Sequence, residues 1–245
     1  MKGIVAQETP RKRVSKPPEV RREELLDAAE ALSREMGFED MPVEAVTSRA
    51  GVAKGTFYLY FSSKSDLLEQ LMQRYSATLM EQLFEVLKSV EGASALERLQ
   101  TFWVKAAQYK ESYNAAAFAD VLFDDGNGTL RARTFQMWAD SFGEMVLGIV
   151  RDGKADGSFD IEDPEMVADI IISIWFDAAT RLWTRVRKLS GQALVDAFIS
   201  GIKEYCHAHD RLLGVPDGSF DVLSQIDAAG ILKDFDGKYR HGRQS

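Results

Sequence analysis

Apolar side chains recur at helical spacing along nearly the whole chain. The clearest stripe predicts a long amphipathic helix from residue 64 to about residue 90. It comprises Leu68, Leu71, Met72, Tyr75, Leu79, Leu83, Val86 and Leu87. Similar stripes predict helices at residues 19–36, 94–110, 113–123, 129–151, 164–189 and 192–213. Glycine-containing or acidic breaks separate these stripes, so the pattern predicts an all-α protein.

Two shorter helices are predicted at residues 43–50 and 54–61, joined by a turn that contains Gly51. Two short helices joined in this way form a helix-turn-helix, whose second helix enters the major groove of DNA. The charge pattern favours the same interpretation, because residues 45–65 contain three basic residues and no acidic one, although the net charge of the chain is −8.

The order Ala-Gly-Val-Ala-Lys-Gly-Thr-Phe-Tyr-Leu-Tyr-Phe at residues 50–61, followed by Lys64 and a Leu-Leu pair, resembles the DNA-binding domain of the TetR family of bacterial transcriptional regulators. The detailed resemblance covers roughly residues 22–75. It implies an N-terminal three-helix helix-turn-helix domain followed by a larger helical ligand-binding and dimerisation domain. The implied DNA contacts are Lys54, Gly55, Thr56 and Tyr60 to bases, Tyr58 and Lys64 to phosphates, and Thr47 and Ser48 to the backbone.

Two positions depart from the family pattern, in which hydroxyl residues usually open the two short helices. This chain has Met41 and Ala53 there, and neither can cap a helix, at a typical cost of about 1 kcal/mol. Pro42 suits the first turn of a helix, and Asp40 is a candidate cap. The departures affect phosphate contacts at these two positions rather than the fold.

The chain divides into four predicted regions. Residues 1–18 form a disordered basic arm, residues 19–75 the DNA-binding domain, residues 76–213 the ligand-binding and dimerisation domain, and residues 214–245 a tail with a short helix near residues 220–235. Residues 1–22 contain seven basic and two acidic residues, which leaves the remainder at −13. The arm either follows the DNA backbone or minor groove, or is a solvated tail.

A second copy of the chain is the simplest cover for the two last predicted helices. Residues 167–179 are apolar almost all round, and residues 192–213 are similar. A helix that is apolar on several faces must be covered on several sides, so we expect a homodimer through a four-helix bundle. The alternative is that the C-terminal segment covers these helices within one chain. In a dimer, recognition helices about 34–36 Å apart would require a palindromic operator in double-stranded DNA.

The central helices are rich in aromatic residues, which either form a plain core or line an effector cavity. The candidates for the cavity are Trp103, Phe135, Trp138, Phe142, Trp175 and Phe176. We therefore expect an apolar or aromatic small-molecule effector. Polar side chains that could orient it are Tyr109, Asn114, Gln136 and Asp177, and an anion could be held by Arg131, Arg133 or Arg181.

Enzyme chemistry finds little support. Cys206 and His209 share a helical face, but His207 turns away from it, so a metal site lacks further ligands. No phosphate-binding glycine loop or nucleophile motif is present. We expect no enzyme activity, no cofactor and no metal. A single cysteine, the lack of an apolar run long enough for a membrane span and the lack of a signal-peptide core predict a soluble cytoplasmic protein.

These observations predict a ligand-responsive transcriptional regulator, most simply a repressor that leaves its operator when an effector binds the C-terminal domain. The alternatives are a constitutive or architectural DNA-binding protein without an effector, and an activator of the same fold.

Overall fold

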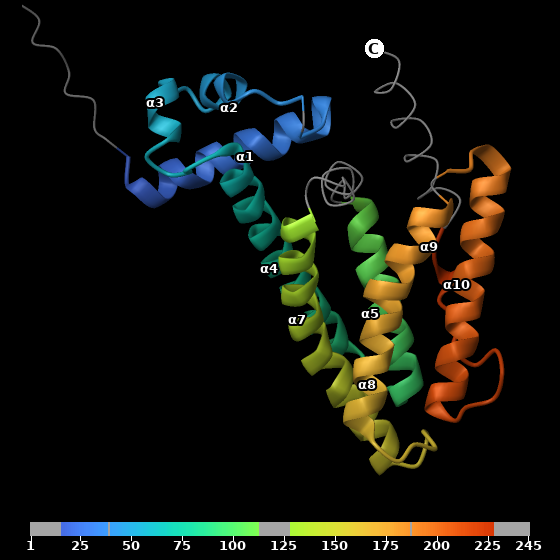
Figure 1. Cartoon of the computed structure of the whole chain (residues 1–245). Helices are drawn as coiled ribbons and strands as arrows, with labels where there is room; N and C mark the ends of the chain where they lie inside the picture. Colours follow the sequence, from blue (N-terminus) through green and yellow to red (C-terminus); the bar gives the residue numbers. More distant parts are fainter. Residues whose placement is uncertain (1–15, 39, 113–127, 187, 228–245) are drawn as a thin grey trace, which may run out of the picture. The chain divides into compact units, whose positions relative to one another are not determined.

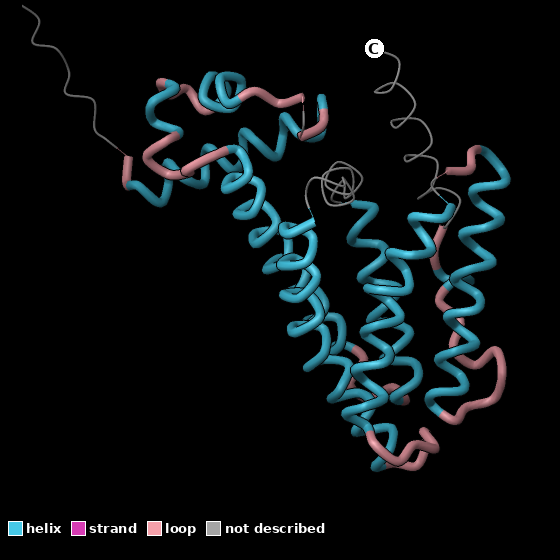
Figure 2. The backbone as a smooth tube through the Cα atoms, in the orientation of Figure 1, coloured by secondary structure: helices cyan, strands magenta, loops and turns pink. Residues whose placement is uncertain are grey.

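The described residues of the computed structural model are 16–38, 40–112, 128–186 and 188–227, and within them every regular element is a helix (Figure 2). This confirms the predicted all-α fold. The chain divides into two compact units, one ending at Leu68 and the other beginning at Glu69. Within the described ranges, no helix is both long and apolar enough to cross a membrane.

The first unit contains three helices and the start of a fourth, shown in blue to teal in Figure 1. They are α1 (Pro18–Met36), α2 (Val43–Arg49), α3 (Lys54–Phe57) and α4 (Lys64–Ser89). Gly37 ends α1 with a positive φ of 81° and donates its N–H to the Ser33 carbonyl at 3.0 Å. The core of this unit consists of buried apolar side chains from all four helices and their connections, among them Leu25, Leu26, Leu32, Phe38, Met41, Val46, Phe57, Phe61 and Leu67.

The predicted helix at residues 54–61 is shorter than expected, because α3 ends at Phe57. After Phe57 the chain continues in tighter turns, in which Leu59 N–H donates to the Thr56 carbonyl at 3.2 Å and Tyr60 N–H to the Phe57 carbonyl at 3.0 Å. The tighter path still buries both Phe57 and Phe61, whose ring centroids lie 5.2 Å apart. Packing of these two rings therefore determines the local path of the chain.

The second unit packs the remaining helices side by side (Figure 1). They are α5 (Ala95–Ser112), α7 (Gly128–Ala155), α8 (Pro164–Ser173), the π-helix η2 (Ile174–Ala178), α9 (Ala179–Val186), α10 (Gly191–Leu213) and the 3-10 helix η3 (Leu223–Gln225). Helix α7 packs against α5 and α8, while α10 packs against α8 and α9. Asp163 caps α8, its carboxylate accepting the Met166 N–H at 3.0 Å.

Two predicted helices in this unit have a different extent in the structure. The stretch at residues 164–189 is not one α-helix, since it contains η2 and ends at Val186. The helix predicted at residues 129–151 is longer than expected, because α7 continues to Ala155. Gly153 lies in the helix, and a Cβ atom there would lie 2.2 Å from the Phe159 ring, so its small size permits close packing rather than a turn.

Part of the predicted tail helix is also missing. Of residues 220–227, the described part of the predicted tail helix, only Leu223–Gln225 is helical. Phe220 and Val222 are buried. The neighbouring backbone is held by a side chain of α10 instead: the buried Asp210 carboxylate accepts the N–H groups of Gly218 and Phe220, both at 2.7 Å. The remainder of that prediction, and the helix predicted at residues 113–123, lie outside the described residues.

Candidate nucleic-acid interface and effector pocket

The turn between α2 and α3 has the geometry expected of a helix-turn-helix. Gly51 adopts a φ of 66°, a left-handed conformation that glycine adopts without strain. Val52 N–H donates to the Thr47 carbonyl at 2.9 Å, and Gly51 N–H donates to the Ser48 carbonyl at 3.1 Å. These bonds close the turn, so that α3 packs directly against α2.

Neither short helix has a side-chain cap. Pro42 and Ala53 occupy the N-cap positions, and no side chain bonds the free N–H groups there. Asp40 is therefore not the cap of α2, contrary to one expectation, since Pro42 lies between it and the helix. Met41 is buried in the core, which explains how an apolar residue replaces a hydroxyl without leaving an exposed thioether.

The start of α3 presents two of the candidate base contacts. The Lys54 ammonium is exposed and forms an ion pair with the carboxylate of Glu44 in α2. Their hydrogen bond holds the pKa of Glu44 below its ordinary value and raises that of Lys54. Gly55 is exposed, and a Cβ atom added there would meet nothing within 4 Å, so a ligand can approach its backbone closely. Thr56 and Tyr60 are half-buried.

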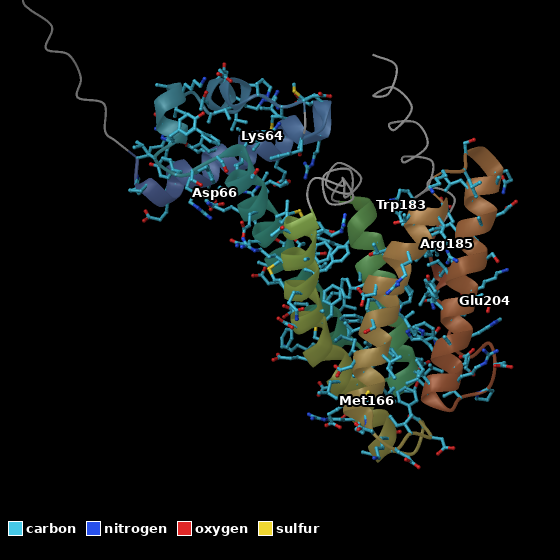
Figure 3. The ribbon with its side chains drawn as sticks, viewed as in Figure 1. Lys64, Asp66, Met166, Trp183, Arg185 and Glu204 are labelled. Atoms are coloured by element: carbon cyan, nitrogen blue, oxygen red, sulfur yellow. The ribbon has the colours of Figure 1, made fainter. Side chains whose placement is uncertain are left out.

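The two candidate phosphate contacts, Tyr58 and Lys64, each lie beside a buried aromatic ring. Tyr58 is 55% exposed, with its ring edge-on to Phe57 at 5.2 Å. Lys64 begins α4, and its ammonium lies 5.0 Å from the centre of the Phe38 ring. Figure 3 labels Lys64 and Asp66 in this first turn.

Side chains already bond one N–H group in the first turn of α4 and one just before it. The Ser63 hydroxyl accepts the Asp66 N–H at 3.1 Å, and the Asp66 carboxylate accepts the Ser62 N–H at 2.7 Å. This arrangement resembles a capping box. A phosphate at this end would therefore depend on the Lys64 ammonium more than on the helix terminus.

The two weaker candidates in α2 differ in position. The Thr47 side chain is buried, and its hydroxyl donates to carbonyls within its own helix at 3.1 and 3.2 Å, which favours a packing role. Ser48 is exposed. The sequence analysis missed Glu44, because its separation of ten positions from Lys54 does not indicate that the two side chains pair.

The six aromatic residues proposed for the effector cavity form one connected cluster in the second unit. Trp103 stacks on Trp175 with ring centroids 4.6 Å apart, Trp103 and Phe142 are 6.0 Å apart, and Phe142 and Phe176 are 5.5 Å apart. Phe176 also lies 5.8 Å from Phe135 and 6.2 Å from Trp138. The structure thus brings together residues that are up to 73 positions apart in sequence.

A pocket of about 620 Å³ opens beside this cluster, between α7 and the column formed by α8, η2 and α9. Of the six aromatic candidates, Phe135 and Phe176 line it, while the other four lie outside its lining. Four of the polar and charged candidates also line it: Arg131, Gln136, Asp177 and Arg181. Arg133 is exposed and does not line it, and Tyr109 is buried elsewhere. Asn114 lies outside the described residues.

The π-helix η2 organises the second unit in a way that the apolar pattern did not indicate. Phe176 and Asp177 line the pocket, whereas the Trp175 indole donates to Nε2 of His209 in α10 at 2.9 Å. The Tyr205 hydroxyl of α10 donates to the Ala178 carbonyl at 2.6 Å. The pocket lining and α10 are therefore joined through five consecutive residues.

The same contacts argue against the Cys206–His209 metal site. Nε2 of His209 already accepts a hydrogen bond, and burial raises the pKa of the Cys206 thiol. Within the described part of the chain, no group of three or more histidine, cysteine or acidic residues could hold a metal ion.

Comparison with known proteins agrees with this arrangement. Residues 25–71 match the family model of bacterial regulatory proteins of the tetR family. The HTH-type transcriptional repressor KstR of Rhodococcus jostii is 29% identical over 168 residues, which span 67% of this chain and 74% of that protein.

Solved structures extend the similarity along the chain. RolR in complex with resorcinol aligns with a TM-score of 0.56 and 18% identity, over 88% of this chain and 93% of RolR. FadR from Bacillus subtilis in complex with stearoyl-CoA aligns with a TM-score of 0.52 and 24% identity, over 75% of this chain and 96% of FadR. The helix-turn-helix region of this chain thus matches the tetR family of bacterial regulatory proteins over residues 25–71, and the fold along most of the chain is that of these solved structures.

Proposed function

We propose that this protein is a transcriptional repressor that binds a palindromic operator as a homodimer and is released when a small molecule binds its second unit. The observation that carries the proposal is the helix-turn-helix, in which the Gly51 turn presents Lys54, Gly55 and Tyr58 on exposed positions. The similarity to the repressor KstR over two thirds of the chain supports repression rather than activation.

Exposed apolar residues support dimerisation through α8 and α10. Met166 and Ile170 of α8 are 57% and 37% exposed, and Figure 3 labels Met166 near the start of that helix. In α10, Phe198 and Ile199 are only half-buried. A second copy would bury both faces, and two-fold symmetry would pair each face with its counterpart.

Effector release is supported by the contacts between the aromatic cluster and α4. The Trp138 indole donates to the Ser76 hydroxyl of α4 at 2.5 Å, and Tyr75 of α4 lies 6.1 Å from the Trp138 ring. Trp138 in turn stacks on Phe135, which lines the pocket. Helix α4 starts at Lys64, a proposed phosphate contact, so movement at the pocket can change the position of that residue.

The relatives support a ligand-responsive second unit. RolR was solved with resorcinol and FadR with stearoyl-CoA. Shifting an equilibrium from 1:99 to 99:1 requires about 5.5 kcal/mol of differential binding, which one buried ligand can provide. The pocket beside the aromatic cluster favours this mechanism over constitutive DNA binding.

Fluorescence anisotropy with the DNA upstream of the protein's own gene, across a salt series, tests the DNA-binding part. We expect tight, salt-dependent binding that Tyr58→Ala and Lys64→Ala weaken, with the salt slope of Lys64→Ala smaller by about one. Lys105→Ala is the matched control, because it removes an exposed positive charge from α5 in the second unit. If selection from genomic fragments returned no preferred sequence, the regulator assignment would fail.

A further inference from the structure

The pocket between α7 and η2–α9 combines an aromatic wall with two guanidinium groups. Arg131 belongs to α7 and Arg181 to α9, fifty positions later, yet both line the same pocket as Phe135 and Phe176. Asp177 is the single acidic residue in the lining. The charged side chains of the lining therefore leave an excess of one positive charge beside apolar surface.

We propose that this pocket takes an amphipathic anion, a small molecule with an apolar body and one carboxylate or phosphate group. The apolar body would lie against Phe135, Phe176 and Ile172, and the oxyanion would be held by Arg131 and Arg181. This assignment rests on the proposed function, because it gives the chemical class of the effector. It refines the expectation of a merely apolar or aromatic ligand.

Arginine suits this role because its planar fork donates two parallel hydrogen bonds to a carboxylate or phosphate. Arg181 forms no ion pair with any described residue, and its exposed side chain leaves the guanidinium accessible. Thr180, Ser173 and Gln136 also line the pocket, and their hydroxyl and amide groups can donate to a second oxygen. Among the described residues, Gln136 already donates its amide N–H to Asp140 at 2.7 Å, which fixes its orientation.

The pocket volume is compatible with such a molecule. About 620 Å³ lies within the range of roughly 300–1,000 Å³ typical of small-molecule sites. The apolar lining from Ala132, Ala139 and Ile172 continues beside the two phenylalanines. A neutral hydrocarbon would use only this part of the lining and would make no use of the two guanidinium groups.

The test compares four ligands that share one apolar chain and differ only in the polar group. Purified full-length protein is titrated by calorimetry, without DNA, with dodecanoate, dodecyl phosphate, dodecanol and dodecylamine, each below its self-association concentration. Charged hydrogen bonds at a partly exposed site predict that at least one anion binds roughly tenfold more tightly than dodecanol. The two anions distinguish a carboxylate ligand from a phosphate ligand.

Three variants assign the effect to residues. Arg131→Gln and Arg181→Gln should each remove most of the preference for the anion, whereas Arg133→Gln should retain it. Arg133 is the matched control because it is exposed on α7 but does not line the pocket. Circular dichroism of each variant checks that the helical fold is intact.

The proposal is overturned if dodecanol or dodecylamine binds as tightly as both anions, if no ligand binds, or if Arg133→Gln loses the preference as fully as the other two variants. The DNA-binding assay is independent of these titrations. Operator binding without anion preference would overturn only the ligand class, and anion binding without any preferred DNA sequence would overturn only the proposed function.

Discussion

His209 provides a quantitative test of the packing in the second unit. It is fully buried in α10, where Nε2 accepts the Trp175 indole N–H at 2.9 Å and Nδ1 lies 2.6 Å from the Tyr205 carbonyl. Indole only donates and a carbonyl only accepts, so the ring is neutral with its proton on Nδ1. Phe220 stacks on it at 4.5 Å. Burial lowers the pKa of His209 to about 4, although the Tyr205 carbonyl and the Asp210 carboxylate act in the opposite direction.

The sign and size of the resulting pH dependence follow from linkage. The unfolded chain binds the proton with a pKa near 6.5 and the folded chain with a pKa of about 4, so acid favours the unfolded state. The stability is complete above pH 6.5 and falls as the pH decreases from 6.5 towards 4. At about 1.4 kcal/mol per pH unit, the complete loss amounts to about 3 kcal/mol, of which about 2 kcal/mol is lost by pH 5.

Urea unfolding between pH 7.5 and 4.5, at fixed protein concentration and ionic strength, measures this loss. The variant His209→Gln should be less stable at pH 7.5, because it loses the stacked ring, but its stability should decrease less on acidification. His207→Gln is the control, since His207 is half-buried on the same helix and should retain the wild-type slope. The reasoning is refuted if His209→Gln and the wild type lose the same free energy over this pH range.

Two other predictions concern the two units separately. Glu44→Gln releases Lys54 and removes a negative charge beside it, so DNA affinity at low salt should rise by roughly two- to fivefold. Glu35→Gln leaves the Lys54 ion pair intact and should have a smaller effect. Anisotropy titrations with DNA measure both affinities. An unchanged Glu44→Gln affinity would show that the pair does not oppose DNA binding. In α7, Gly153→Ala should lower the free energy of unfolding by about 1–3 kcal/mol because of the ring beside it. A Cβ atom added at Gly148 would meet no atom within 4 Å, so Gly148→Ala should raise the free energy of unfolding by about 0.5–1 kcal/mol. If thermal unfolding showed that both alanine variants were stabilised, the packing argument for Gly153 would be contradicted.

The fold was largely predictable from the sequence because amphipathic periodicity reports which face of a helix is buried. The starts of α2, α3 and α4 agree with the predictions. Errors occurred where a tertiary contact replaced a local preference. The predicted helix at residues 129–151 stopped short of Gly153, because the Phe159 ring that packs against this glycine from beyond the helix end is not visible in the local pattern.

The candidate sites were predictable in composition but not in arrangement. Aromatic content identified the cluster, yet no spacing rule indicated that Phe135 and Phe176 would line the pocket while Trp103 would stack on Trp175. The ion pair between Glu44 and Lys54 also depends on how α2 and α3 pack, so charge counting along the chain could not reveal it.

The π-helix η2 has a consequence for how this protein can tolerate insertions and deletions. A π-turn contains about one residue more than an α-turn of the same length. Removal of one residue from Ile174–Ala178 would therefore restore a regular helix and leave the ends of α8 and α9 nearly in place. The same deletion would rotate Asp177 away from the pocket lining and Trp175 away from His209. A length change of one residue, which is ordinarily severe inside a helix, could thus remodel the pocket lining and its link to α10 while preserving the surrounding bundle.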